Sequence, residues 1–271
     1  MILLLSGEGQ TDLGNAPVSG ACGDRFIPGP IAKIAEHLLL PFLQFEIFHY
    51  AKSKPETVHL VKVGFLSELC KKIPAGTPIL IPEVKVPKGG GIYRKQAQVL
   101  GTYALELSNT QRDDVVVLFF RDADGTNASH RTEADEKRAS IKNGFDMAGF
   151  RHGVPVVPKP KSEAWLLCWL NIQSREEERS SGRKRGGRLK NATTAIGGCA
   201  GLEDLSGNDA SPNSPKRKLE EYLEHAPSND EMCGWITDGR VDPTKIDMPS
   251  FNAFKSRLEE VLTDIGLARH Y

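Results

Sequence analysis

The chain has 271 residues, of which 39% are hydrophobic and 26% are charged, and 35 basic residues balance 35 acidic ones. This composition excludes a disordered, collagen-like or fibrous chain, and the longest apolar runs fall far short of the ~20 residues that cross a membrane. Because the net charge is zero, a nucleic-acid partner would have to be attracted by a local basic patch or by another subunit.

The first residues predict a strand instead of a targeting sequence. Residues 1–5 lack the basic region and the apolar region of about 7–15 residues that form a signal peptide. The five cysteines are odd in number and scattered, and they contain no C-x-x-C pair. Together these features predict a cytoplasmic protein with reduced thiols, without a zinc site and without a membrane-spanning segment.

Short continuous apolar runs predict strands that are buried on both faces, at 2–5, 78–81, 115–120 and 154–157. Helix-length patterns alternate with them, at 28–50 (which Pro30 and Pro41 start or interrupt), 93–108, 133–149 and 162–171. Alternation of strands and helices is typical of the doubly wound α/β class, in which helices cover a mostly parallel sheet. We therefore predict one such domain over residues 1–172.

The composition changes after residue 172. Residues 173–214 are rich in Arg, Ser, Gly and Asn and have no apolar periodicity, which predicts a loop or linker. Two helical patterns follow at 215–225 and 249–266. They predict a helical C-terminal extension, residues 215–271, that covers part of the first domain.

Acidic residues follow three of the predicted strands, namely Glu8 with Asp12, Asp122 with Asp124, and Glu163. Ligands of open α/β sheets bind beyond the carboxyl ends of the strands. Two carboxylates 4 Å apart repel each other by about 4 kcal/mol at an effective dielectric near 20. A divalent cation removes this cost, and Mg²⁺ or Mn²⁺ prefers all-oxygen ligands. The alternative is that each acid caps the helix that follows it.

The segment after the first strand does not fit a nucleotide loop. Gly7 and Gly9 flank Glu8 and allow a sharp turn. Asp12, however, stands where G-x-G-x-x-G has its third glycine, and no Gly-Lys-Ser/Thr follows. Two carboxylates would also repel a pyrophosphate, so a dinucleotide or triphosphate site is disfavoured.

Residues 8–12 (Glu-Gly-Gln-Thr-Asp) and 122–124 (Asp-Ala-Asp), each after a hydrophobic strand, resemble the motifs of the Toprim domain. The closer resemblance is to its branch in OLD-type nucleases and in short stand-alone relatives, whose further motifs are similar to residues 163–167 and 214–219. It spans about residues 1–225. It implies a Toprim-like (Rossmannoid) fold and an Mg²⁺- or Mn²⁺-dependent nuclease that hydrolyses the phosphodiester bonds of DNA or RNA.

The resemblance also implies roles for individual residues. Glu8, Asp122 and Asp124 would bind the metal and carry the phosphodiester chemistry. Asp12 stands where OLD-type members have a second acid, but as an Asp in place of the usual, longer Glu. Glu163 either joins the metal site or caps its own helix.

A basic residue near the metals would correspond to Lys159 or Lys161, and the sequence does not choose between them. Its charge would offset the charge that builds up on the phosphate. The resemblance further implies a role in antiphage defence and an ATPase or sensor partner supplied in trans. The oligomeric state, monomer or homo-oligomer, stays open.

A basic run lies within the predicted linker. Residues 179–190 contain six basic residues and no acidic one. We predict that members of this run, with Arg121 on the same face, contact the phosphates of nucleic acid: Arg183, Lys184, Arg185 and Arg188. The alternative is a solvated linker whose charge balances the acidic residues 176–178.

Two other functions compete with the nuclease. Residues 122–126 (Asp-Ala-Asp-Gly-Thr) also resemble the nucleophile motif of haloacid-dehalogenase-like phosphatases, in which the first Asp attacks the phosphate and the second acts as acid and base. That motif normally lies near the start of the fold, and this interpretation leaves Glu8 without a role. The second competitor is a Toprim-like module that binds a partner and has no catalytic activity.

Overall fold

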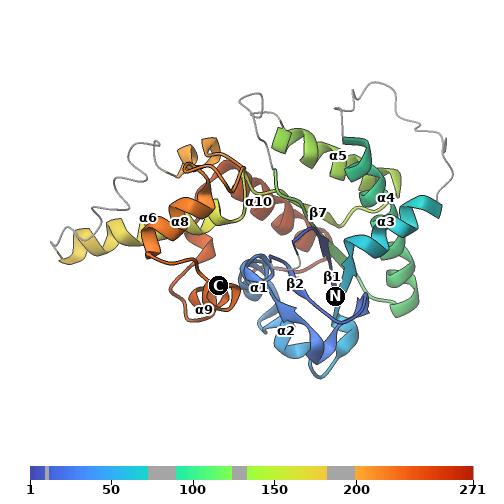
Figure 1. Cartoon of the computed structure of the whole chain (residues 1–271). Coiled ribbons are helices and arrows are strands. Elements are labelled where there is room, and N and C mark those ends of the chain that lie inside the picture. Colours follow the sequence, from blue (N-terminus) through green and yellow to red (C-terminus); the bar gives the residue numbers. More distant parts are fainter. Residues whose placement is uncertain (10–11, 73–89, 124–132, 182–198, 271) are drawn as a thin grey trace.

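The computed structural model describes residues 1–9, 12–72, 90–123, 133–181 and 199–270. A five-stranded sheet lies at its centre, with helices on both faces (Figure 1). The strand order is β3-β5-β1-β6-β7, with bounds Gly20–Ala21, Val58–Lys62, Ile2–Gly7, Val115–Phe120 and Gly153–Val156. Only the short edge strand β3 is antiparallel to its neighbour. The prediction of an α/β protein with a mostly parallel, helix-covered sheet is therefore confirmed.

Strand β1 lies in the middle of the sheet because its side chains are apolar on both faces. Leu3 pairs with Val58 of β5 on one side and with Val116 of β6 on the other. Leu3 and Leu5 point into one core, whereas Ile2 and Leu4 point into the other. A strand that is covered on both faces reads as a continuous apolar run.

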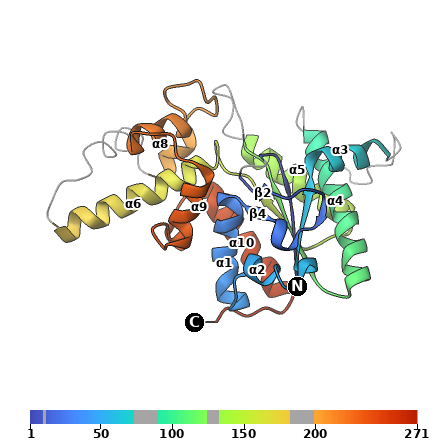
Figure 2. The same ribbon diagram turned by 60° about the horizontal axis from the view of Figure 1, so that its bottom comes forward.

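Three helices cover one face of the sheet: α3 (Val63–Lys72), α4 (Gly90–Gln111) and α5 (Glu133–Met147). In Figure 2, α4 and α5 lie on one side of the sheet, and α1 and α10 lie on the other. Gly144 lets α4 and α5 approach closely, because a Cβ there would collide with the Arg94 carbonyl oxygen and the Ala97 side chain.

The other face is covered by both early and late parts of the chain: α1 (Pro30–Leu43), α6 (Glu163–Ser181), α8 (Pro215–Leu223), α9 (Asn229–Thr237) and α10 (Pro249–Asp264). Trp165 joins these parts, since its indole N–H donates to Ser250 Oγ (2.9 Å) and its ring packs on Phe251 and Phe254. The second half of α6 extends away from this layer (Figures 1 and 2).

Short elements complete the part of the chain that the structure describes. They are the two-stranded sheet of β2 (Gly14–Asn15) and β4 (Ile27–Pro28), the helix α2 (Ile47–Tyr50), and four 3-10 turns at Gly23–Arg25, Pro55–Thr57, Ala200–Asp204 and Pro243–Lys245. None of the described helices is both long and apolar enough to cross a membrane.

The predicted strands at 2–5, 115–120 and 154–157 are confirmed as β1, β6 and β7, whereas 78–81 lies outside the described residues. Strand β5 was not predicted, because the polar His59 interrupts its short apolar run. His59 is nevertheless buried, only 6% exposed, between its register partners Leu4 and Ala21.

The positions of the predicted helices were more accurate than their first and last residues. The pattern at 28–50 forms two helices, because Gln44 ends α1 with a left-handed backbone (φ 61°). Helix α9 was missed. The predicted linker 173–214 is wrong over 173–181, where α6 continues, and at Ala200–Asp204, which forms a 3-10 turn.

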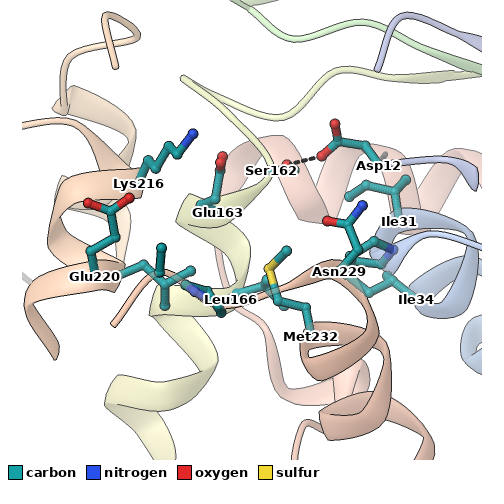
Figure 3. Close-up of a pocket in the computed structure, with 14 residues that line it drawn as sticks. Asp12, Ile31, Ile34, Ser162, Glu163, Leu166, Lys216, Glu220, Asn229 and Met232 are labelled. Atoms are coloured by element: carbon teal, nitrogen blue, oxygen red, sulfur yellow. Dashed lines mark hydrogen bonds between the residues drawn. The ribbon is translucent and has the colours of Figure 1, made fainter. Parts of the chain in front are cut away.

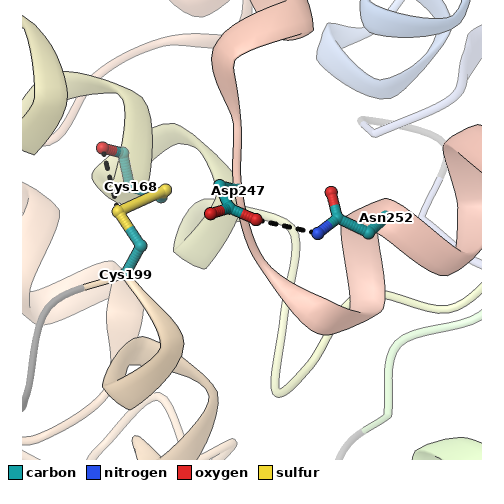
Figure 4. Close-up of a disulfide and its surroundings, with 4 residues drawn as sticks. All are labelled: Cys168, Cys199, Asp247 and Asn252. Carbon is teal, nitrogen blue, oxygen red and sulfur yellow. Dashed lines mark hydrogen bonds between the residues drawn. A yellow bond between two sulfur atoms is a disulfide. The ribbon is translucent and has the colours of Figure 1, made fainter.

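The expectation of five reduced thiols is wrong. Cys168 in α6 and Cys199 form a disulfide with a Cα–Cα distance of 4.9 Å (Figure 4), and Cys22, Cys70 and Cys233 are free. The pair is separated by 31 residues, so no local spacing signals it. Because disulfides are rare in reducing cytosol, the cysteines no longer support a cytoplasmic location.

We predict that Cys199→Ser lowers the free energy of unfolding by about 3–4 kcal/mol, because the disulfide closes a loop of this length in the unfolded chain. Chemical denaturation measures the change, with Cys70→Ser as control. Thiol titration of the unfolded protein should give three reactive cysteines before reduction and five after it. Five before reduction would contradict the disulfide.

Burial lowers the pKa of His59, and the nearby Glu56, which raises the pKa, offsets this effect only in part. Protonation therefore favours the unfolded chain. Its cost is absent above the unfolded-state pKa of about 6.5, grows as the pH falls below that value, and is complete below the folded-state pKa. We predict that His59→Gln makes the free energy of unfolding less sensitive to pH between 8 and 5, measured by urea denaturation.

His225 provides a control of opposite sign, because its hydrogen bond to Glu231 raises its pKa. Its contribution to stability is present at low pH and is lost as the pH rises. His225→Gln should therefore steepen the loss of stability on acidification, and a His59→Gln profile parallel to that of the wild type would contradict the prediction.

Candidate functional site

The strand order reverses between β1 and β6, and in open α/β sheets such a reversal is where a crevice is expected, at the carboxyl ends of the two strands. The chain leaves β1 for α1 on one face and leaves β6 for α5 on the other. The connections therefore diverge, which is the usual position of ligand sites in open α/β sheets. Because Gly7 pairs with Phe120 in the register, Glu8 and Asp122 both emerge at this point.

Glu8 and Asp122 contact each other at the crevice. The backbone N–H of Asp122 donates to Glu8 Oε1 (3.1 Å), although 114 positions separate the two residues. Gly7 permits the close approach, since a Cβ there would lie 2.7 Å from the Phe120 carbonyl oxygen. The structure thus brings together the first acid of the chain and the first acid of the Asp-x-Asp pair; Asp124 lies outside the described residues.

Lys137 of α5 holds the segment that carries Asp122, a contact that the sequence did not predict. Its ammonium donates to the carbonyl oxygens of Asp122 (2.9 Å) and Ala123 (3.0 Å), and the side chain is buried. Its Nζ lies 3.8 Å from Glu133 and over the ring of Tyr93. The only signal in the sequence is a lysine on the inward face of a charged helix, one turn after Glu133.

Arg121 lies inside the protein, contrary to the expectation that it contacts nucleic acid. Its side chain is 1% exposed, and its guanidinium donates to the Phe120 carbonyl oxygen (2.9 Å) and to Gln96 Oε1 (2.8 Å). Burial lowers its pKa, whereas the charge of Glu8 raises it. An arginine stays protonated under such conditions, so Arg121 places a positive charge beneath the crevice.

Asp12 and Glu163 belong to a second group, which faces a pocket of about 250 Å³ (Figure 3). Gly9 (φ 76°) turns the chain after Glu8, and Asp12 closes the turn by donating its N–H to the Gly9 carbonyl oxygen (3.1 Å). The Ser162 hydroxyl donates to Asp12 Oδ1 (2.7 Å). Asp12 therefore ties the loop after β1 to the start of α6.

The pocket that contains Asp12 and Glu163 is acidic at its polar rim. Burial is the main cause that raises the pKa of Glu163, and the charges of Asp12 and Asp209 raise it further. Lys216 also lines the pocket, whose floor is formed by apolar side chains that include Ile31, Ile34, Leu166 and Met232. The structure thus divides the predicted acidic cluster between this pocket and the crevice.

The two candidate lysines occupy different surroundings. Lys161 pairs with Asp209 (2.8 Å), and Lys159 lines a cavity with Arg138 and Asp204. The lysine that contacts the Asp122 segment is Lys137. Four members of the predicted nucleic-acid contact, Arg183, Lys184, Arg185 and Arg188, lie outside the described residues.

The capacity to bind a metal depends on the acids at the ends of β1 and β6. Within the described ranges, no group of three or more His, Cys, Asp or Glu side chains is arranged to hold a metal ion. The carboxylate of Glu8 meets the backbone of Asp122 at one point, and Asp124, the second acid of the Asp-x-Asp pair, lies outside the described residues. Comparison with known proteins gives no further indication, because no family model, curated protein or solved structure matches this chain.

We predict that Lys137→Met lowers the free energy of unfolding by about 1–3 kcal/mol, because it leaves two partly buried carbonyl groups without their donor. Denaturant titration measures the loss. Lys142→Met, an exposed change in the same helix, is the matched control and should have little effect. Equal stability of the two variants would show that Lys137 does not anchor the segment.

Proposed function

We propose that this chain is a metal-dependent phosphodiesterase that acts on nucleic acid, a Toprim-like nuclease. The observation that carries the proposal is the contact between Glu8 and the amide of Asp122 at the point where the strand order reverses. The contact gives a role to both motifs of the resemblance, in the place where α/β proteins bind ligands.

Glu8, Asp122 and Asp124 would hold Mg²⁺ or Mn²⁺. Their donor atoms are all carboxylate oxygens, the ligand type that these cations prefer. The amide of Asp122 engages one oxygen of Glu8, and a carboxylate has further acceptor sites for a cation. When bound, the metal supplies a nucleophile from water and charge stabilisation at the phosphate.

Contacts within the chain support the positions of Glu8 and of the backbone of Asp122. The Asp122 amide orients Glu8, and Lys137 holds the backbone on which Asp122 lies. The buried charge of Arg121 acts on Glu8 from below and reduces the cost of gathering carboxylates before a cation arrives. In this proposal Glu8 is a ligand or a general acid or base, while Asp12 and Glu163 serve the adjoining pocket.

Two further parts of the proposal are the biological role of the protein and the choice between a nuclease and a phosphatase. In this proposal the protein is a cytoplasmic antiphage effector, and the defence role and the ATPase or sensor partner follow from the resemblance alone. The competing phosphatase would use Asp122 as a nucleophile and Asp124 as acid and base, and it gives Glu8 no part. The structural contact of Glu8 with Asp122 favours the nuclease.

We predict that the protein cleaves single-stranded or duplex oligonucleotides with Mg²⁺ or Mn²⁺, and that Glu8→Gln and Asp122→Asn each lower the rate by at least about 100-fold. Gel-resolved cleavage measures the rate, and calorimetry with Mn²⁺ measures the loss of metal affinity. Glu46→Gln and Asp264→Asn, both exposed, are matched controls and should keep full activity.

The outcomes separate the candidates. Full hydrolysis of small phosphomonoesters by Glu8→Gln, with loss in Asp122→Asn, would favour the phosphatase. Unchanged biological activity in both variants would favour a partner-binding module. Cleavage of nucleic acid that persists at the wild-type rate in both variants would place the active centre elsewhere or in a contaminant.

A further inference from the structure

A second cavity adjoins Glu8, on the side of β1 opposite to Asp122. It has a volume of about 280 Å³ and lies at the carboxyl ends of β1 and β5. Glu8 and Lys62 line it, and they emerge from adjacent strands because Gly7 pairs with Lys62 in the register. We propose that this cavity is a subsite for one unpaired nucleotide, so that the substrate is single-stranded where it is cut. This inference rests on the proposed nuclease.

The charges of this cavity suit a segment of polyanion. It contains one carboxylate, Glu8, which the proposed metal would neutralise, and one cation, Lys62, whose ammonium donates to the Pro17 carbonyl oxygen (3.2 Å). An ammonium has three donors, so Lys62 can also contact a phosphate. The pocket of Asp12 and Glu163 has three carboxylates, including Glu220, against Lys216 alone, and would repel the same ligand.

The walls of the cavity suit a flat, largely apolar ring. Leu13 and Leu60, buried side chains of the same core, form part of its lining. Gly9 and Gly64 also line the cavity. Because glycine has no side chain, a ligand can approach the backbone closely at these two positions. The lining residues offer apolar contacts and backbone polar groups. Such a surface can bind a base without side chains that distinguish one base from another.

The size of the cavity suits one nucleotide better than a base pair. Its volume of about 280 Å³ is close to the lower end of the range of about 300–1,000 Å³ that small-molecule sites occupy. A base within a duplex would have to leave its stack and its partner, at a cost of a few kcal/mol, whereas an unpaired base pays least. The cavity beside the proposed centre therefore selects single strands.

Gly64 allows a test that fills the cavity with little disturbance of the fold. A Cβ at Gly64 meets no atom within 4 Å, and its backbone is not in the left-handed region. Gly64→Leu should therefore project a side chain into open space at the cavity. Gly234→Leu is the matched control, because Gly234 is equally open, lies in α9 and is not a lining residue of this cavity.

The experiment measures the binding of ten-residue oligothymidylate and oligouridylate by fluorescence anisotropy with Ca²⁺ in place of Mg²⁺, so that a divalent cation neutralises Glu8 while cleavage is suppressed. We expect Gly64→Leu to weaken binding of at least one of these probes by about tenfold or more, equivalent to ~1.4 kcal/mol, and Gly234→Leu to leave both unchanged. Lys62→Gln should weaken binding at low salt and reduce its salt dependence. Thermal melting verifies that each variant is folded.

With Mg²⁺ or Mn²⁺ present, wild-type protein should cleave a single strand at least about tenfold faster than the same sequence in a duplex, because only the single strand is already unpaired. Binding that depends on Gly64 without any cleavage would reject the nuclease and keep the subsite. Cleavage with unchanged binding in both Gly64→Leu and Lys62→Gln, or equal cleavage of duplex, would reject the subsite and keep the nuclease.

Discussion

The candidate site depends on one topological constraint, the adjacency of β1 and β6 in a parallel sheet whose strand order reverses between them. Parallel strands require crossover connections, and these have a fixed hand. The connections that follow β1 and β6 must therefore leave on opposite faces, and the sheet edge between them stays open. Glu8 and Asp122 meet at that opening although more than a hundred positions separate them. The strands bring the residues together because their apolar side chains pack on both faces, so packing in the core places the polar groups at the edge.

The energetic problem at this edge is the gathering of negative charge near a buried sheet. A carboxylate removed from water needs donors or opposite charges. The protein supplies a backbone N–H for Glu8, a buried guanidinium beneath it, and a buried ammonium for the carbonyl groups of residues 122 and 123. None of these groups is a surface cation of the kind that the basic run suggested. The positive charge that matters for the crevice is inside the fold, where solvent screens it least.

Sequence patterns predicted those parts of the fold that depend on local periodicity. The runs at 2–5 and 115–120 could be identified because both faces of these strands are covered, and the acids beyond them then follow from the rule for strand ends.

The rest of the fold and of the site depends on contacts between residues that are far apart in the chain. Strand β5 was missed because the buried His59 interrupts its apolar pattern. The pairing of Cys168 with Cys199 was missed because it has no local signal in the sequence. Lys137 looks like any lysine on a charged helix until α5 is placed beside β6. Asp12 follows β1 together with Glu8 in the sequence, but its side chain accepts from Ser162 at the start of α6, whereas Glu8 accepts from the Asp122 amide.

One residue of each acidic group follows β1, and the two residues have different partners. Glu8 accepts from the Asp122 amide, whereas Asp12 accepts from Ser162 at the start of α6, whose Trp165 is packed against α10. The C-terminal helices complete the second core instead of lying on a finished domain. The C-terminal part thus supports the helix to which Asp12 is bound, while the pairing of β1 with β6 brings Glu8 to the Asp122 amide.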